Sequence, residues 1–487
     1  MIIRNALGLG TLLLATLLGG AGCGGGSGAG ATGPGGKGGI KAGSGANVSS
    51  AAANKFKAGL DSLAQHDKAN DWSDASCTAT AGLFLDAAKE QGDKFSEATY
   101  NAGLAYQRCR KTAEAKAQFQ ATLSKDPKNH RARMQLALFK FAESGERDYD
   151  GTIAELRQAA ITDAQFKNVE ALVHLGMMYM KRNNTSADND GANDLARAKK
   201  YAQSALAVDD GFMPAFNLLA LIYLESAKQK AGRVAGQKAI TNAAKAKKVD
   251  TQALELAALV CSQAIRKNAN YAPIHNTAGM INVELGNLNS AVQSFNTARQ
   301  KDPTFFEAQM NYAAVNMQFR GFAQAEEAYR AALKMRPTDY DAHFGLALAL
   351  RGQVNDSNFD KMVAASAAEL DAAKKAAPDR AETYYNEAIL TQEFKARSGG
   401  KGAEKPLNDA KALFAQFVSK AGASAEFAEA VKRSKERMAE IDQVITFNKQ
   451  TEAEQKAAAA DAKTKEAEAE AKGGDEGETP PPPPEKK

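Results

Sequence analysis

The sequence predicts an all-α fold, a right-handed superhelical solenoid of antiparallel helix pairs with disordered termini. Three observations lead to this prediction. Two copies of one pattern lie end to end between Tyr271 and Pro337, with matching features about 34 residues apart. Small residues occupy fixed places in both copies, with an aromatic residue between them. Each copy closes with a proline, Pro303 or Pro337, at which a helix must stop.

The fixed residues explain why the helix pairs should stack. The matching positions are Gly279 and Ala313, Ala291 and Ala325, Phe295 and Tyr329, and Ala298 and Ala332. Small residues let two helices approach closely, and Phe295 shares a helix face with Ala291. One pair cannot cover this apolar face, so the next pair must cover it. The pattern resembles the tetratricopeptide repeat (TPR), and this resemblance implies a surface that holds other proteins.

Residues 1–22 have the features of an export signal peptide. Arg4 precedes a short apolar run, small residues follow, and Cys23 comes next. This order resembles the bacterial lipoprotein signal, which implies that Cys23 is acylated and becomes the first mature residue. Several acyl chains give stable anchoring, and Gly24 in place of aspartate favours the outer membrane. The alternative is an ordinary secretory signal followed by an incidental cysteine.

The remaining segments follow in chain order. Residues 23–50 contain the lipidated cysteine and a glycine-rich flexible tether that has nothing to pack. Residues 51–421 should form a solenoid of roughly nine helix pairs, matching the repeat best at Ser96–Pro127 and Ala272–Pro337. The expected C-terminal segments are a capping helix over 424–448, a charged alanine-rich helix over 449–472 and a disordered proline-rich tail over 473–487.

No residue pattern points to catalysis or to nucleic-acid binding. The formal net charge of +5 is small for a chain of 487 residues. The chain contains no H-E-x-x-H, G-x-S-x-G or Walker sequence. We therefore expect no enzyme activity, cofactor, metal ion or small-molecule substrate. His275 and His343 occupy the same place in their repeats, and we interpret both as structural residues between helices.

The cysteines of the predicted solenoid fall into two groups. Cys261 occupies the place of Phe295 and should be a buried core thiol. Cys77 and Cys109 lie at nearly equal distances from a turn expected near Asp93, on helices that should run antiparallel. They should therefore face each other, and an exported protein enters an oxidising compartment. We expect a Cys77–Cys109 disulfide, and the sequence leaves its oxidation state open.

One insert between helices is strongly basic. Ser226–Lys248 contains no acidic residue, and its basic residues are Lys228, Lys230, Arg233, Lys238, Lys245, Lys247 and Lys248. Such a segment can contact anionic lipid headgroups or an acidic partner. The alternative is a solvated basic helix or loop.

The concave groove of the solenoid is the expected partner-binding site. In TPR arrays the first helix of each pair lines the inner face, where extended peptides or partner helices dock. The residues expected there are Tyr100, Leu104, Asn276, Met280, Met310, Met317, Phe344 and Leu348. The alternative is that some of them pack on adjacent helices. Asn311 fits the chaperone-type carboxylate clamp, but Met280, Asp341 and Gly345 stand where its other polar residues are needed, which disfavours that binding mode.

Most of the mature chain resembles a bacterial TPR lipoprotein, and in length and interrupted repeats it is similar to the TPR lipoprotein of the myxobacterial gliding-motility machinery. The resemblance implies an outer-membrane-anchored scaffold that faces the periplasm and binds other envelope proteins in an envelope-spanning complex. One alternative is an assembly factor or pilotin for an outer-membrane protein, a pilus or a secretion system. Another is an enzyme with a TPR targeting arm, which would need a catalytic domain for which no segment is left.

Overall fold

The computed structural model describes residues 47–69, 71–92, 94–160, 168–238, 250–396 and 403–473. Of 230–238 and 466–473 it describes the backbone alone. The described residues form two compact units, a first unit that ends at Val315 and a second unit that begins at Asn316. They contain helices and turns but no β-strand, and Asp188 and Gly191 form one isolated bridge. The predicted all-α fold is therefore confirmed.

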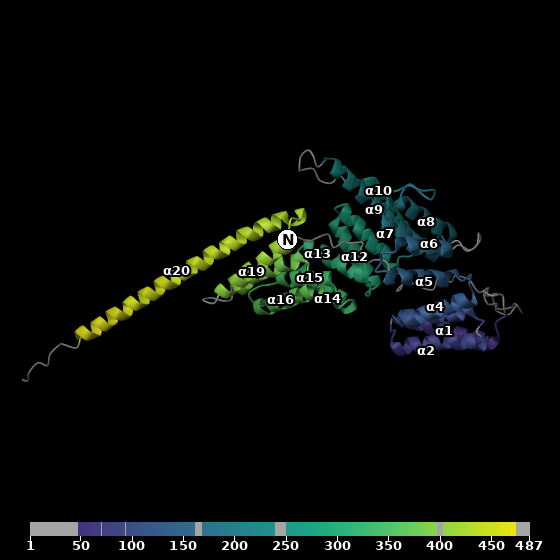
Figure 1. Cartoon of the computed structure of the whole chain (residues 1–487), viewed down its shortest axis with the longest axis horizontal. Helices are drawn as coiled ribbons and strands as arrows, with labels where there is room; N and C mark the ends of the chain where they lie inside the picture. The colour runs from purple at the N-terminus through teal and green to yellow at the C-terminus, as the bar shows by residue number, and fades with distance from the viewer. Residues whose placement is uncertain are drawn as a thin grey trace, which may run out of the picture. The chain divides into compact units, whose positions relative to one another are not determined.

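The first unit is a succession of helices, each packed on the next (Figure 1). Its helices are α1 (Ser50–Ala69), α2 (Asp74–Glu90), α3 (Ser96–Arg108), α4 (Thr112–Lys125), α5 (His130–Glu143), α6 (Tyr149–Ala160), α7 (Val169–Arg182), α8 (Asp194–Val208), α9 (Met213–Lys238), α10 (Thr251–Lys267), α11 (Ala272–Glu284) and α12 (Leu288–Lys301). Among them, α7 also contacts α9, and α9 contacts α11. The first helices of successive pairs therefore lie side by side.

The second unit continues the same alternation of first and second helices. The helix α13 (Phe306–Gln318) begins in the first unit and ends in the second. The elements that follow are α14 (Phe322–Met335), α15 (Tyr340–Gly352), α16 (Phe359–Ala376), α17 (Ala381–Leu390), the π-helical turn η2 (Thr391–Lys395), α19 (Glu404–Ala421), the 3₁₀ turn η4 (Ala425–Phe427) and α20 (Ala428–Gly473). In chain order, the described helices make nine pairs followed by α20.

Glycines in the first helices make room for aromatic rings from the second helices. A Cβ atom placed on Gly279 of α11 would lie 2.5 Å from a ring carbon of Phe295 on α12. The same relation joins Gly103 of α3 to Phe119 of α4 and Gly59 of α1 to Phe84 of α2, at 2.7 Å in both cases. All three rings are fully buried. In these three pairs a glycine therefore makes room for the phenylalanine ring that fills the centre of the pair.

His275 and His343, which occupy the same place in their repeats, each form a hydrogen bond to the loop that precedes their helix. The Nε2 atoms of His275 and His343 lie 2.9 Å from the carbonyl oxygens of Ala269 and Pro337, six residues earlier in each case. Because a carbonyl oxygen only accepts, each Nε2 must donate. Gln309, at the matching place of the repeat between them, donates to the carbonyl oxygen of Pro303 at 3.2 Å. A glutamine makes the same bond, so the place requires a donor rather than an aromatic ring.

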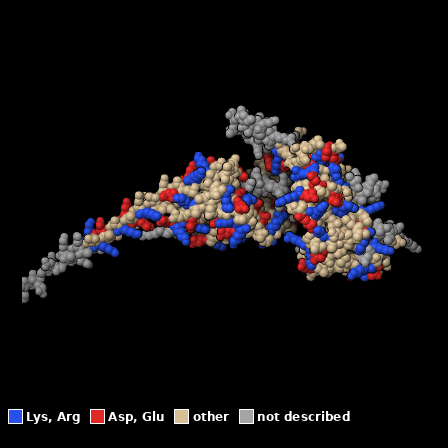
Figure 2. Space-filling view, in the orientation of Figure 1, with Lys and Arg blue, Asp and Glu red and all other residues tan. Residues whose placement is uncertain are grey.

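The two helices expected over 424–448 and 449–472 are one continuous helix, α20. Its N-terminal part packs on α19 through buried Ile441 and Ile445. Beyond Lys449 the apolar residues end, but alanine, glutamate and lysine are strong helix formers, and no proline or glycine occurs before Gly473. The helix therefore continues, with acidic and basic residues interspersed along it (Figure 2).

None of the described helices combines the length and the apolar character needed to cross a lipid bilayer.

Candidate functional site

The eight residues predicted for the groove all lie on first helices. Tyr100 and Leu104 are on α3, Asn276 and Met280 on α11, Met310 and Met317 on α13, and Phe344 and Leu348 on α15. Less than a tenth of the surface of Tyr100, Asn276, Met280, Met317 and Leu348 is exposed, whereas Leu104, Met310 and Phe344 are half-buried. Met317, Phe344 and Leu348 belong to the second unit and the other five to the first. The groove itself stays a prediction.

Hydrogen bonds between side chains join three successive first helices of the first unit. Thr277 Oγ1 on α11 lies 2.6 Å from Asn217 Oδ1 on α9. Asn311 Nδ2 on α13 donates to Asn276 Oδ1 on α11 at 2.9 Å. All four residues are less than a tenth exposed. We call these four residues the polar row; it holds the first helices in register with one another, because a buried amide must keep its hydrogen-bond partner.

Two members of the polar row, Asn217 and Thr277, were not predicted from the sequence. Thr277 lies 34 residues before Asn311, so the repeat period itself would have found it. Asn217 was harder to find, because the long insert after α9 breaks the period there.

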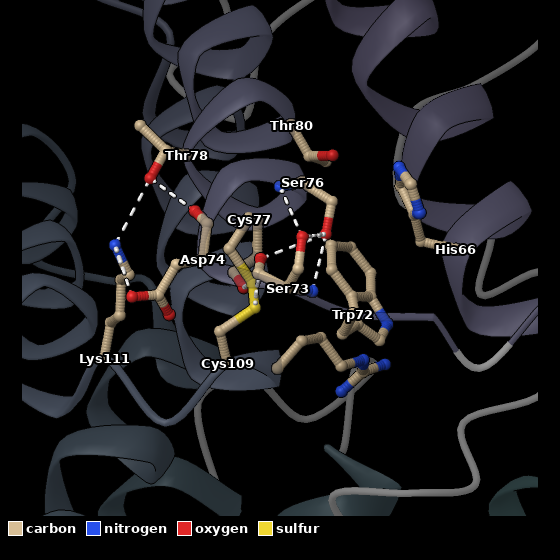
Figure 3. The surroundings of a disulfide bond; sticks show 12 residues. His66, Trp72, Ser73, Asp74, Ser76, Cys77, Thr78, Thr80, Cys109 and Lys111 are labelled. Atoms are coloured by element: carbon tan, nitrogen blue, oxygen red, sulfur yellow. Dashed lines mark hydrogen bonds and ion pairs between the residues drawn. A yellow bond between two sulfur atoms is a disulfide. The ribbon is translucent and has the colours of Figure 1, made fainter.

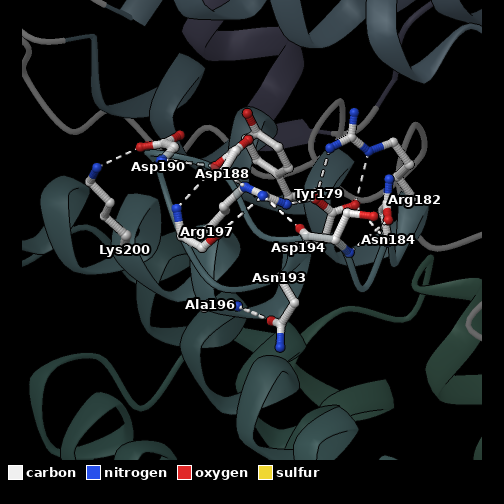
Figure 4. Close-up of polar contacts among 12 residues, drawn as sticks. Tyr179, Arg182, Asn184, Asp188, Asp190, Asn193, Asp194, Ala196, Arg197 and Lys200 are labelled. Atoms are coloured by element: carbon white, nitrogen blue, oxygen red, sulfur yellow. Dashed lines mark hydrogen bonds and ion pairs between the residues drawn. The ribbon is translucent and has the colours of Figure 1, made fainter.

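The polar insert between α7 and α8 is organised by one buried arginine (Figure 4). Arg197 is 2% exposed, and its Nε and NH1 atoms donate to Asp188 Oδ1 and Asp194 Oδ1 at 2.8 and 2.7 Å. Its NH2 donates to the carbonyl oxygens of Ser186 and Gly191 at 2.8 and 3.1 Å. A buried guanidinium is tolerated only when it is paired and hydrogen-bonded. These bonds fix the path of the insert.

Aromatic rings complete this cluster. The guanidinium carbons of Arg157, Arg182 and Arg197 lie 5.8, 5.2 and 5.8 Å from the ring centre of Tyr179. The ring of Tyr201 stacks on Tyr179 with centres 5.7 Å apart. Cations are attracted to the faces of aromatic rings at such distances. The cluster therefore ties α6, α7 and α8 together through the insert.

Asp190 is the acceptor at the edge of the cluster. Tyr201 Oη and Arg157 NH2 donate to its Oδ2 at 2.6 and 2.8 Å, and Lys200 pairs with its Oδ1. Burial would raise the pKa of Asp190, but the bonds from Lys200 and Tyr201 outweigh it and hold that pKa below its ordinary value. The acidic residues are thus paired with cations, and no group of His, Cys, Asp or Glu in the described ranges is arranged to hold a metal ion. The arrangement supports a structural role for the insert.

Cys77 and Cys109 form a disulfide (Figure 3). Their Cα atoms are 6.2 Å apart, within the range that a disulfide spans. Cys77 is buried near the start of α2, and Cys109 follows the last residue of α3, so the bond joins two pairs. Cys261 is a buried free thiol on α10, and burial raises its pKa to about 12. A thiol with such a pKa is unreactive.

The two other predicted sites are the basic insert and the lipid-attachment cysteine. The structure describes few of their side chains. Lys228 Nζ is 3.3 Å from Glu284 Oε1, so a carboxylate of α11 already pairs with this residue of the basic insert. Lys230, Arg233 and Lys238 lie on the part of α9 for which only the backbone is described. Lys245, Lys247, Lys248 and the expected lipidated Cys23 lie outside the described residues.

The comparisons with known proteins concern the fold alone. No protein-family model matches the sequence, and no curated protein matches it. Among solved structures, the chain is similar to a thermophilic TPR protein of Thermus thermophilus, with 21% identity, a TM-score of 0.36, and coverage of 46% of this chain and 99% of that chain. It is also similar to PilF of Pseudomonas aeruginosa, with 17% identity, a TM-score of 0.38, and coverage of 54% and 97%. It is similar as well to the human IFIT1 dimer with m7Gppp-AAAA, with 17% identity and a TM-score of 0.45. That match covers 76% of this chain and 78% of that chain.

Proposed function

We propose that the protein is a lipid-anchored scaffold of the outer membrane that faces the periplasm and holds other envelope proteins through its first helices. The observation that carries this proposal is the polar row, which joins α9, α11 and α13 side by side. A stack of such helices offers an extended surface whose shape is fixed before a partner arrives, which lowers the entropic cost of binding. The complex that we propose spans the envelope, and gliding motility is one such process.

The lipid anchor is the part of this proposal that the sequence supports. Cys23 directly follows the small residues of the export signal, and the glycine-rich tether separates it from α1. A Cys23→Ala variant should move from the membrane fraction to the soluble fraction, because it loses its acyl chains. A Cys23→Ala variant that still sediments with the outer membrane, at the same position in a density gradient as the parent protein, would contradict lipid anchoring.

Copurification tests the scaffold role. The mature protein, carrying an affinity tag and solubilised in mild detergent, should retain a defined partner at constant stoichiometry. An assembly factor would instead leave no permanent complex, and its deletion would lower the abundance of its client. Recovery of the protein alone, from membranes crosslinked before solubilisation, would contradict a scaffold role.

A further inference from the structure

The two cysteines of the Cys77–Cys109 disulfide lie in different surroundings (Figure 3). Cys77 is completely buried, whereas Cys109 is half-buried and follows the last residue of α3. Thiol–disulfide exchange begins when a thiolate from outside reaches one sulfur atom of the bond. In the folded protein, Cys109 therefore offers the side of the bond that a thiolate can approach.

Positive charge surrounds the more accessible cysteine. Cys109 lies between Arg108 and Arg110 in the sequence, and Lys111 comes next. Arg108 is paired with Asp67, whereas Arg110 is exposed. Reactive cysteines occur in partly exposed, electropositive surroundings of this kind. These cations attract a thiolate, which is an anion, toward the Cys109 side of the bond.

Each sulfur atom lies beside a main-chain carbonyl oxygen. Cys77 Sγ is 3.1 Å from the Ala105 oxygen, and Cys109 Sγ is 3.1 Å from the Ser73 oxygen. The N–H group of Cys109 does not continue the helix by donating to Ala105, because it donates to the Tyr106 oxygen at 3.2 Å. A sulfur atom in a disulfide has no hydrogen to donate, whereas a thiol has one. Both thiols of the reduced protein would thus find an acceptor already in place.

Non-covalent contacts hold the same junction without the disulfide. The Nε and NH2 atoms of Arg108 donate to the two carboxylate oxygens of Asp67 at 2.9 and 3.2 Å. Trp72 Nε1 donates to Asp67 Oδ1 at 2.9 Å, and Lys111 Nζ donates to Thr78 Oγ1 at 3.3 Å. These bonds join the end of α3 to α1 and α2. The disulfide can therefore open while both helix pairs stay folded.

We propose that the Cys77–Cys109 disulfide is a thiol-exchange site of the folded protein, and that its partner is the dithiol of an oxidoreductase in the compartment that receives the exported chain. One thiolate of the dithiol attacks Cys109 Sγ and forms a new S–S bond. The bond to Cys77 breaks, and its electron pair leaves with Cys77 Sγ, which takes up a proton. This inference goes beyond the proposed scaffold function and does not depend on it.

The second thiol of the partner completes the exchange. Its thiolate attacks the partner's own sulfur atom in the mixed disulfide, and Cys109 leaves and takes up a proton. The partner is oxidised to a disulfide, and this protein gains two electrons and two protons. A monothiol cannot do this, because Cys77, whose Cα lies 6.2 Å from that of Cys109, attacks the mixed disulfide and expels the monothiol again.

The first test identifies the sulfur atom that exchanges. Full mature protein carrying Cys261→Ala, which removes the buried free thiol, receives either Cys77→Ala or Cys109→Ala. Oxidised glutathione should modify Cys109 at least about 10-fold faster than Cys77, because only Cys109 is accessible. Mass spectrometry after an acid quench measures both rates. In concentrated urea the two rates should become similar, which is the matched control.

The second test asks whether exchange needs unfolding. Reduced thioredoxin, a dithiol protein, should open the disulfide of the Cys261→Ala protein at a rate that urea below the unfolding transition leaves unchanged. Glutathione at the same thiol concentration should be slower by about 10-fold or more. Trp72, the only tryptophan, should keep its emission maximum in the reduced protein, because its bond to Asp67 remains.

Four results would overturn the proposal. They are modification of Cys77 as fast as Cys109 in the folded variants, a thioredoxin rate that rises with urea as unfolding does, a shift of Trp72 emission to that of the unfolded chain, and no reduction by thioredoxin. Glutathione as fast as thioredoxin would overturn the dithiol in favour of a small monothiol. If a single-cysteine variant lacks the helical circular-dichroism spectrum of the parent, the thioredoxin test decides alone.

Discussion

At the scale of single residues, the interior of three helix pairs depends on a glycine facing a phenylalanine ring. Gly279 is buried against Phe295. Any larger residue at this position would carry a Cβ atom that collides with the Phe295 ring unless the ring moves. Gly82 on α2 provides the contrast, since a Cβ atom there would meet nothing within 4 Å. The same substitution should therefore have opposite effects at the two positions.

Replacing Gly279 by alanine should destabilise the first unit by about 1–3 kcal/mol, the usual cost of overpacking a core. Gly82→Ala should be neutral or stabilising by up to about 1 kcal/mol, because alanine favours the helix. Urea unfolding followed by circular dichroism measures both free energies. A Gly279→Ala variant as stable as Gly82→Ala would show that the Phe295 ring does not fill the space beside Gly279.

His174 on α7 makes stability depend on pH. It is buried, its Nδ1 has no hydrogen-bond partner, and burial lowers its pKa to about 4. The ordinary pKa is roughly 6.5. The unfolded chain therefore binds a proton that the folded chain does not, and stability is complete above pH 6.5 and falls as the pH drops toward 4. The loss between pH 7.5 and pH 5 should be roughly 2 kcal/mol.

His174→Gln should remove that part of the pH dependence, measured by urea unfolding at both pH values. The control is His275→Gln, because Gln309 makes the same loop bond at the matching position. It should keep the pH dependence of the parent. Parallel pH profiles for the parent and His174→Gln would mean that His174 is not held neutral in the folded protein.

At the scale of elements, the repeat period predicted helices far better than it predicted the bonds between them. The period places Gly279, Phe295 and Pro303 within one repeat, because their contacts are local to that repeat. The cluster around Tyr179 was not predictable, because Arg157, Arg182 and Arg197 come from three different helices and meet only after the insert has folded. The predicted boundary within α20 is wrong, because an apolar stripe can end where a helix continues on alanine, glutamate and lysine.

The Cys77–Cys109 disulfide is the covalent link between the first two pairs. It closes a loop with a sequence separation of 32. Constraining an unfolded chain of that length stabilises the fold by about 3–4 kcal/mol. The double variant Cys77→Ala, Cys109→Ala should therefore melt at a lower temperature than the parent, and a reductant should lower the melting temperature of the parent but not that of the double variant.

Cys261→Ala is the matched control for the disulfide, because Cys261 is buried and unpaired. This variant should keep its response to the reductant. Alkylation of the denatured, unreduced parent should label Cys261 and leave Cys77 and Cys109 unlabelled in the mass spectrum. Labelling of all three would show that the protein is not oxidised in the cell.

At the scale of the whole molecule, the first helices carry the proposed function. Their order along the chain was predictable from the period, but the exposure of the groove residues was not. Asn276 and Met280 are almost fully buried, because neighbouring side chains cover positions that the period alone places on a surface. Met310 remains half-buried on α13, whereas Leu259 is 52% exposed on α10, a second helix. These two residues therefore represent a first helix and a second helix of the first unit.

Photo-crosslinking in the cell from these two positions tests the central claim most directly. A photoreactive residue at Met310 should give one defined adduct with a partner protein, because the first helices hold the partner. The same residue at Leu259 should give no adduct of that size, although it is the more exposed position. Adducts from Leu259 and none from Met310 would show that partners bind the second helices, which would contradict the account.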